Sequence, residues 1–306
     1  VSAQAEVKSQ QFQKQLHGLG DRVAKTVRKH NSKSQKTILA EMLNAQISAA
    51  QATVSHFIQQ ADGHQHNTKF RDEFNESVLV FIYGKVKAGK SSLGNFIGQH
   101  PEQKTTPQFF KYDKAGQRTA QAKLEELAEN GFETKVTEAT DTIQGFKING
   151  LTWIDTPGLH SLTGANGDLA KRYVEAADLI LYITSSDSPA RASDNAEIVE
   201  LVGTKNKKVC VILSKSDWMY DDEVDGELVQ VRKGKSASDR QIQEGHAKTE
   251  LSKLLGDQAN PIDRIHSCST LLGYDGIQGN AEAWQQSNMD EIYQLLTQEA
   301  IVNAKK

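Results

Sequence analysis

Cysteine and proline are scarce in this sequence, which has two cysteines and five prolines among its 306 residues. Cys210 and Cys268 show no disulfide spacing and the chain has no signal-like start, so a reducing, cytoplasmic setting is expected, with peripheral contact to a membrane as the other option. The longest apolar runs, 78–83 and 179–183, are far shorter than the roughly 20 residues of a membrane-spanning helix. The sequence predicts neither a disulfide-rich secreted fold nor a chain that crosses a bilayer by itself.

An excess of either charge is also missing, since the formal net charge is -3. A nucleic-acid partner is therefore not expected from overall electrostatics. Hydrophobic residues make up 37% and charged residues 25% of the chain, which predicts an ordinary core in one or two domains. Because the sequence begins at Val1, the natural ends of the protein are not read from it.

The first 76 residues lack proline and place apolar side chains at helical steps. One stripe precedes a predicted break at 29–34, and a second runs from 39 to 61. Near the other end, Trp284, Ile292, Leu295, Leu296 and Ile301 share a helical face. We therefore predict a helical bundle built from 1–76 and 281–306. The alternative is a small helical subdomain that only supports the core.

Between these ends, residues 77–280 alternate short apolar strands with helical segments, which predicts an α/β domain with a mainly parallel sheet. The expected strands are 77–83, 142–149, 151–155, 178–184, 207–213 and 262–267. The expected helices are 90–99, 118–130, 168–177, 191–203, 240–256 and 286–303. Residues 221–239 are charged and contain glycine and serine, which favours an exposed loop.

The stretch "GKVKAGKS", residues 84–91, follows an apolar strand and precedes a helical pattern, as a phosphate-binding loop does. Its two glycines allow successive backbone N–H groups to point at phosphate oxygens. Lys90 is expected to reach the β- and γ-phosphates, and the Ser91 hydroxyl to ligate Mg²⁺. The candidate nucleotide ligands here are Gly84, Lys85, Ala88, Gly89, Lys90, Ser91 and Ser92.

Two further motifs follow in order along the chain. "DTPG" places Asp155 at a strand end, where it can hold a Mg²⁺-bound water, and brings the Gly158 N–H near the γ-phosphate. "SKSD" ends in Asp217, which can accept two hydrogen bonds from guanine, while the stem of Lys215 lies along the base. Ser267, Cys268 or Ser269 is expected to face the guanine O6.

These three motifs in this order resemble the GTPases related to translation factors, and within them the dynamin superfamily. Residues 176–202 and the form "SKSD" are similar to dynamin-like proteins, most of all the bacterial ones. The resemblance implies a P-loop GTPase domain that binds GTP or GDP with Mg²⁺, a helical neck, and homodimerisation through the GTPase domain. Membrane lipid or a second dynamin-like chain is the further partner that it implies.

GTPases also need a switch threonine that completes the Mg²⁺ shell, and Thr137, Thr140 and Thr142 are candidates. Thr140 is favoured because "EAT" resembles the immunity-related GTPases at this point. It is thus a candidate metal ligand and catalytic residue, together with Gly158. Residues 100–134 have no assigned role.

The usual water-orienting glutamine is replaced by Leu159. Dynamin-like proteins hold a monovalent cation with help from the phosphate loop, but here Val86 and Lys87 stand at those positions, so such a cation stays open. We hypothesise that Lys87 neutralises charge on the γ-phosphate, as an arginine does in guanylate-binding proteins. The alternative is a solvent-exposed Lys87. His160 is a weaker candidate.

The leading function is GTP hydrolysis by a dynamin-like protein, stimulated by dimerisation and coupled to membrane remodelling. One alternative is a regulatory GTPase associated with ribosomes or RNA. Another is a GTP-binding scaffold with little turnover, because the glutamine is absent.

Overall fold

In the computed structural model the described residues are 2–31, 42, 45–58, 71, 73–74, 76–101, 105–112, 143–148, 150–155, 174, 176–204, 207–224, 226–256 and 262–304. The chain divides into two compact units, Val1–Phe70 and Arg71–Lys306. The domain boundaries expected after residues 76 and 280 stay predictions. No described helix is both long enough and apolar enough to span a bilayer.

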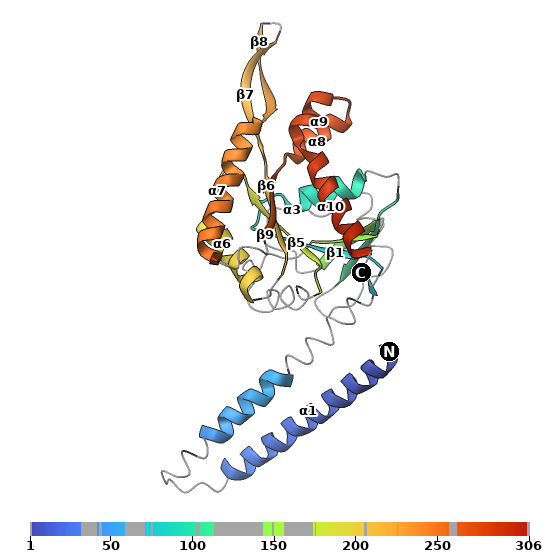
Figure 1. Cartoon of the computed structure of the whole chain (residues 1–306), viewed down its shortest axis with the longest axis vertical. Helices are drawn as coiled ribbons and strands as arrows, with labels where there is room; N and C mark the ends of the chain where they lie inside the picture. The colour runs from blue at the N-terminus through green and yellow to red at the C-terminus, as the bar shows by residue number, and fades with distance from the viewer. Residues whose placement is uncertain are drawn as a thin grey trace. The chain divides into compact units, whose positions relative to one another are not determined.

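The first unit consists of α1, Ser2–Asn31, and the helical residues 45–58, which lie side by side in Figure 1. They approach closely at Gly20, where a Cβ would lie 2.9 Å from the Ile58 Cδ1 atom. The helix α1 ends inside the break predicted at 29–34. Phe12 and Phe57 remain 59% and 54% exposed, so the apolar stripes of this unit are not fully covered within it.

The second unit is built on a seven-stranded sheet in the order β2-β3-β4-β1-β5-β6-β9 (Figure 1). The five strands from β4 to β9 are parallel, while β2 and β3 run antiparallel to their neighbours. This confirms the predicted α/β fold with a mainly parallel sheet. The strands are β1 Val78–Tyr83, β2 Gln108–Tyr112, β3 Ile143–Ile148, β4 Leu151–Asp155, β5 Leu179–Ser185, β6 Val209–Ser214 and β9 Ile262–Ser267.

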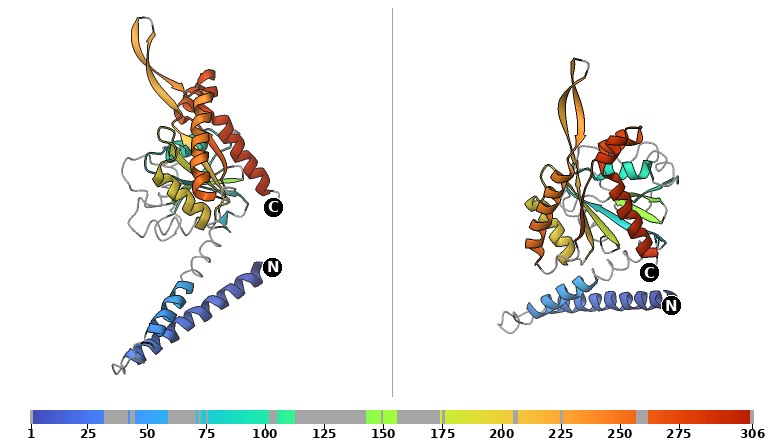
Figure 2. Two further views of the ribbon diagram at one scale, coloured as in Figure 1. Left: turned by 60° about the vertical axis from the view of Figure 1, so that its left-hand side comes forward. Right: turned by 45° about the horizontal axis from the view of Figure 1, so that its top comes forward.

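Helices cover both faces of this sheet, which explains why β1 and β5 are continuous apolar runs rather than alternating ones (Figure 2). On one face, the buried cluster joins alternate residues of β1, such as Val80 and Ile82, to Leu93 and Phe96 of α3. α3 is Lys90–Gln99, and α8 Thr270–Ile277, α9 Ala281–Ser287 and α10 Met289–Ala304 lie on the same side. α6 Ala192–Val199, the π-helical Glu200–Thr204 and α7 Ala237–Leu255 lie on the other.

The C-terminal helix α10 packs on the sheet. Ile292, Leu295 and Leu296 are buried in the same apolar cluster as β1, and Glu299 pairs with Lys208 at 2.6 Å. These three residues of the apolar face predicted to join a neck bundle thus lie in the core of the second unit. The bundle of both chain ends stays a prediction.

The prediction of an exposed loop at 221–239 was wrong. This segment belongs to an antiparallel hairpin of β7, Asp217–Val224, and β8, Glu227–Gly234, followed by the first turns of α7. Gly226 supplies the turn with a φ of 84°, and the Ser236 hydroxyl caps α7 by accepting from the Asp239 N–H. The strands were missed because both faces of the ribbon reach solvent, so charged residues occupy positions that are apolar in a buried strand. The strand β2 and the helix α8 were not predicted.

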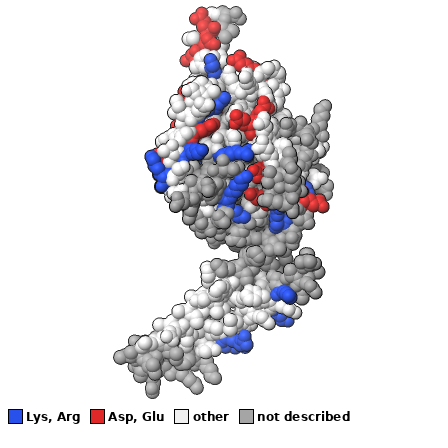
Figure 3. All heavy atoms as spheres, viewed as in Figure 1, with Lys and Arg blue, Asp and Glu red and all other residues white. Residues whose placement is uncertain are grey.

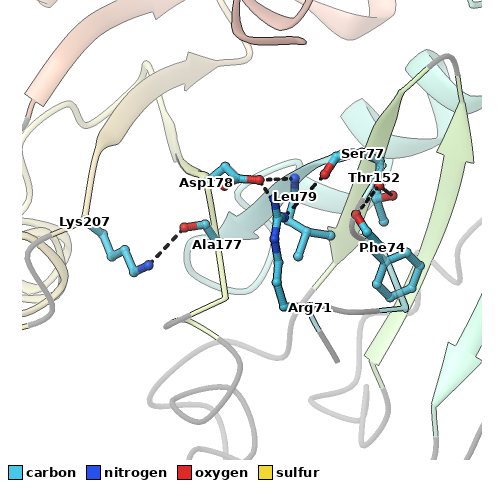
Figure 4. Close-up of polar contacts among 8 residues, drawn as sticks. All are labelled: Arg71, Phe74, Ser77, Leu79, Thr152, Ala177, Asp178 and Lys207. Atoms are coloured by element: carbon cyan, nitrogen blue, oxygen red, sulfur yellow. Dashed lines mark hydrogen bonds and ion pairs between the residues drawn. The ribbon is translucent and has the colours of Figure 1, made fainter. Parts of the chain in front are cut away.

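At the amino ends of the central strands, a polar cluster holds the start of the second unit (Figure 4). Arg71 donates to an Asp178 carboxylate oxygen at 2.7 Å, and the same oxygen accepts from the Leu79 N–H at 2.8 Å. The Ser77 hydroxyl lies 2.6 Å from that of Thr152. These contacts fix β1 at the edge of the sheet opposite the motifs that carry chemistry.

Candidate nucleotide-binding site

The loop 84–89 joins β1 to α3 at the carboxyl edge of the sheet. Gly84 has a φ of 137°, and a Cβ there would lie 2.0 Å from the Ile183 carbonyl oxygen, so only glycine fits. Gly89, with a φ of 98°, is the N-cap of α3. Lys87 also has a positive φ, 65°, and its side chain is exposed. The loop therefore has the curvature of a phosphate cradle at a helix N-terminus.

Lys90 is the first residue of α3, and its side chain reaches back to this loop. Its ammonium donates to the Gly84 carbonyl at 2.7 Å and to the Lys85 carbonyl at 2.9 Å. Burial lowers the pKa of Lys90, while the nearby carboxylates of Asp155 and Glu197 act in the opposite direction. An ammonium held only by neutral carbonyls can exchange them for phosphate oxygens, which are stronger acceptors.

Asp155 ends β4 next to this loop and is 4% exposed. Its Oδ2 atom accepts from the Ser91 hydroxyl at 3.1 Å and from the Gln144 amide at 3.3 Å. Its Oδ1 atom is buried and has no hydrogen-bond partner within the described parts of the chain. Burial raises the pKa of Asp155, and Lys90, Gln144 and Ser91 oppose that rise.

An orphaned carboxylate oxygen beside a helix-terminal hydroxyl fits Mg²⁺, which prefers oxygen ligands and keeps several waters when it binds a nucleotide. Among the described residues, no group of three or more His, Cys, Asp or Glu forms a metal cage. The protein share of such a site is thus Ser91 and Asp155, with phosphates supplying the rest. Thr140, predicted as a metal ligand, and Gly158, whose N–H was predicted to lie near the γ-phosphate, are outside the described residues.

A buried polar chain behind the loop was missed in the sequence. Lys85 forms an ion pair with Glu197 of α6, which is 2% exposed and accepts from the Tyr182 hydroxyl at 2.6 Å. Asp194 of the same helix accepts from the Thr184 hydroxyl at 2.5 Å. Burial, followed by the contacts with Glu197, raises the pKa of Tyr182. Asp194 and Glu197 lie three residues apart, a spacing that places both carboxylates on one face of a helix. This spacing was the sequence signal from which the cluster could have been predicted.

At the base end of the site, Ser214 of β6 contacts the phosphate loop, because its hydroxyl donates to the Ala88 carbonyl. Lys215 follows with a φ of 55° and an exposed side chain. Asp217 begins β7, and its Oδ2 atom lies 3.2 Å from the Nε atom of Arg232 on β8. The hairpin therefore places a cation beside the carboxylate predicted to read guanine.

The loop 267–269 lies against this segment, since the Ser216 N–H donates to the Cys268 carbonyl at 3.0 Å. The Cys268 thiol packs in the apolar core, and burial, with a smaller effect of Asp217, raises its pKa to about 12. Ser269 is used as the N-cap of α8. The Ser216 and Ser267 hydroxyls are buried and lack a hydrogen-bond partner in the described chain. Of the three candidates for guanine O6, Ser267 thus has unused hydrogen-bonding capacity.

Lys235 is the residue after β8 and contacts the segment that lies next to Lys215. It was also missed in the sequence. It is 6% exposed, donates to the Ser186 hydroxyl at 2.8 Å and lies 3.5 Å from an Asp187 carboxylate oxygen. Ser186 in turn donates to the Lys215 carbonyl at 2.7 Å. Lys235 therefore connects the hairpin to the segment beneath the predicted base site.

A family model and two curated proteins are similar to parts of this chain. Residues 98–216 match the dynamin family. An uncharacterized protein of Acinetobacter baylyi is 31% identical over 176 residues, which cover 56% of this chain and 32% of that protein. The tRNA modification GTPase MnmE of Campylobacter concisus is 28% identical over 179 residues, covering 56% of this chain and 34% of MnmE.

Among solved structures, an oligomerised bacterial dynamin pair matches over 94% of this chain and 53% of its own, with 15% identity and a TM-score of 0.47. Era of Aquifex aeolicus bound to GDP and aluminium fluoride matches over 72% of this chain and 56% of its own, with 18% identity and a TM-score of 0.41. The aligned part of the chain spans about a third of the length of the two curated relatives.

Proposed function

Because the family match supports a GTPase of the dynamin superfamily, we propose that this chain binds GTP and hydrolyses it to GDP and phosphate in a Mg²⁺-dependent reaction. The observation that carries the proposal is the buried Asp155 carboxylate, whose Oδ2 is bonded to Ser91 and whose Oδ1 is without a partner in the described chain. A protein keeps such a costly arrangement where function needs it.

Each side chain has a role in this proposal. The loop amides and Lys90 bind the phosphates, and Lys90 exchanges the carbonyls of Gly84 and Lys85 for phosphate oxygens. Ser91 and Asp155 would hold Mg²⁺, which when bound would neutralise negative charge on the phosphates. Asp217 accepts from the guanine base, with the Arg232 guanidinium beside its carboxylate.

The base preference has a direct test. Asp217→Asn replaces an acceptor by an amide, which suits a xanthine carbonyl better than the guanine N1–H and amine. We expect this variant to lose affinity for GTP and gain affinity for XTP, measured by titration with fluorescent nucleotides. The matched control Asp221→Asn, on the same strand, should bind GTP as the unmodified chain does. Unchanged GTP affinity in Asp217→Asn would remove Asp217 from the site.

We assign to Lys87 the positive charge that assists catalysis. Its side chain is exposed on the loop, and its backbone has a left-handed conformation. Its ammonium would approach the γ-phosphate when two GTPase domains pair, and would make a monovalent cation unnecessary. The measurement is GTP turnover of Lys87→Ala with and without potassium. A turnover equal to that of the unmodified chain contradicts this role.

The cellular role that we propose is membrane remodelling, with dimerisation of the GTPase domain as the activating step. GTP hydrolysis per chain should then rise steeply with protein concentration. A specific activity that is independent of concentration argues against the dynamin-like reading, and no turnover at any concentration favours a GTP-binding scaffold.

A role on ribosomes or RNA is the second candidate, favoured by the match to a tRNA modification GTPase. The net charge of -3 speaks against it. Co-sedimentation with lipid vesicles and pull-down of ribosomes, each with a GTP analogue, separates the two roles.

A further inference from the structure

The hairpin β7–β8 projects from the body of the second unit (Figures 1 and 2). Each strand has eight residues, so at about 3.3 Å per residue the ribbon is about 26 Å long. The described chain pairs β7 and β8 only with one another, so each has an outer edge with unpaired backbone groups. Soluble proteins rarely leave so long a ribbon unused.

One face of this ribbon, the hairpin face, has an ordered chemistry. Residues directly opposite in an antiparallel pair share a face, and here the pairs are Trp218 with Lys233, Tyr220 with Val231, Asp222 with Val229, and Val224 with Glu227. Trp218 is 49% and Tyr220 38% exposed, although both are large aromatic residues. From the base of the ribbon to its tip, the hairpin face is basic, then apolar, then acidic.

The charges beside the hairpin face extend this gradient. At the tip, Asp221 and Glu223 are exposed on the opposite face of the ribbon, so both faces of the tip are acidic (Figure 3). At the base, a groove of about 720 Å³ is lined by Trp218, Tyr220, Lys233 and Arg240, with Gln286 on its far wall. Arg240 donates to the Gln286 carbonyl at 3.1 Å, and the described part of the chain gives it no ion pair with a carboxylate. The groove thus offers aromatic surface and positive charge.

We propose that the hairpin is a self-association surface, on which a second copy of this chain packs its own hairpin antiparallel to the first. A two-fold interface must be complementary to itself, and a gradient from basic through apolar to acidic meets that condition only when the two ribbons run in opposite directions. The acidic tip of each copy then enters the basic groove of the other, and in the middle the pair Tyr220–Val231 of one ribbon faces the pair Asp222–Val229 of the other.

A lipid surface fits the same hairpin poorly, although Leu228 near the tip is 81% exposed. The four acidic residues around it would be repelled by anionic headgroups. The ribbon is also narrow, so the buried area falls in the small class of interfaces, and the affinity should be micromolar or weaker. This association goes beyond the proposed GTPase function, because it needs neither nucleotide nor the loop 84–91.

Charge reversal tests the proposal with the whole chain and no nucleotide, using sedimentation velocity over a range of concentrations. The tip variant carries Asp222→Lys and Glu227→Lys, and the base variant carries Lys233→Glu and Arg240→Glu. Each variant alone should associate at least about tenfold more weakly than the unmodified chain, because like charges then meet at both contacts. An equal mixture of the two should form a heterodimer.

The mixture is decisive because a misfolded variant cannot regain association by meeting another variant. Lys233→Glu alone serves as a second base variant that leaves the Arg240 bond to Gln286 intact. Lys248→Glu, on the exposed side of α7, is the matched control and should associate normally. A monomeric unmodified chain, association that survives either reversal, or a mixture that stays monomeric each overturns the proposal. So does binding of the hairpin to phosphatidylcholine–phosphatidylglycerol vesicles without self-association.

Discussion

Replacing Asp155 by asparagine should stabilise the nucleotide-free protein. Asp155 is 4% exposed, burial raises its pKa, and its Oδ1 atom has no partner among the described residues. Leaving a buried polar atom unsatisfied costs about 1 to 3 kcal/mol, and more when it is charged; asparagine also leaves one amide atom at the Oδ1 position, so the change removes only the additional cost of the charge. Losing the attraction between Asp155 and Lys90 returns part of this, so we expect a net gain of about 1 to 2 kcal/mol in the free energy of unfolding.

The gain should depend on pH with a defined sign. A carboxyl group whose folded pKa is raised contributes stability below its unfolded pKa of about 3.9, and this contribution is lost as pH rises through the folded pKa. Asparagine does not titrate, so the difference between Asp155→Asn and the unmodified chain should widen from about pH 4 upward and then level off. A gain of 1 kcal/mol corresponds to about 2 to 4 °C in Tm for a unit of this size.

The assay is thermal unfolding without nucleotide and with EDTA, from acid to neutral pH. Asp178→Asn is the matched control, because its carboxylate accepts from both Arg71 and the Leu79 N–H, so this change should lower Tm. A lower Tm for Asp155→Asn at neutral pH, or a difference that does not vary with pH, would refute the reasoning. In the same variant, EDTA should reduce GTP affinity less than in the unmodified chain, since Asp155 helps to hold Mg²⁺.

Three other changes probe the scaffold. Gly84→Ala should abolish GDP binding, because its Cβ would meet the Ile183 carbonyl at 2.0 Å; normal binding by titration would show that the loop tolerates a side chain. Glu197→Gln should weaken GTP binding several-fold without unfolding, since Lys85 loses its ion pair; an unchanged Kd contradicts an anchoring role. Arg71→Met should lower stability by about 1 kcal/mol in urea unfolding, because its partly exposed pair with Asp178 is lost, and leave GTP affinity unchanged.

The sheet was predictable because its strands are buried on both faces. The predicted strands 77–83, 151–155 and 178–184 contain apolar and β-branched runs, and the structure places strands there within one residue. Asp155 and the loop 84–91 were likewise predictable, since both motifs depend on neighbours in sequence. Parallel strands then bring their carboxyl ends to one edge.

What could not be predicted depends on neighbours in space. Gln144 reaches Asp155 because β3 pairs with β4 in that register, and no local pattern specifies the register. The pairing of Lys85 with Glu197 joins positions 112 residues apart in sequence. The hairpin was missed for another reason, since a ribbon exposed on both faces carries charge where a buried strand carries apolar residues.

The strand β1 links the two edges of the sheet. Its carboxyl end leads into Gly84 and the phosphate loop, and its amino end is held by the Leu79 N–H bond to Asp178 and, through Arg71, by the start of the second unit. A strand buried on both faces resists local bending, so it moves as one body with the loop that it carries. A nucleotide-driven shift of the loop should therefore reach Arg71, the residue that follows the first unit in the chain. Hydrogen exchange at Leu79 with and without a GTP analogue would measure this coupling, and equal protection in both states would exclude it.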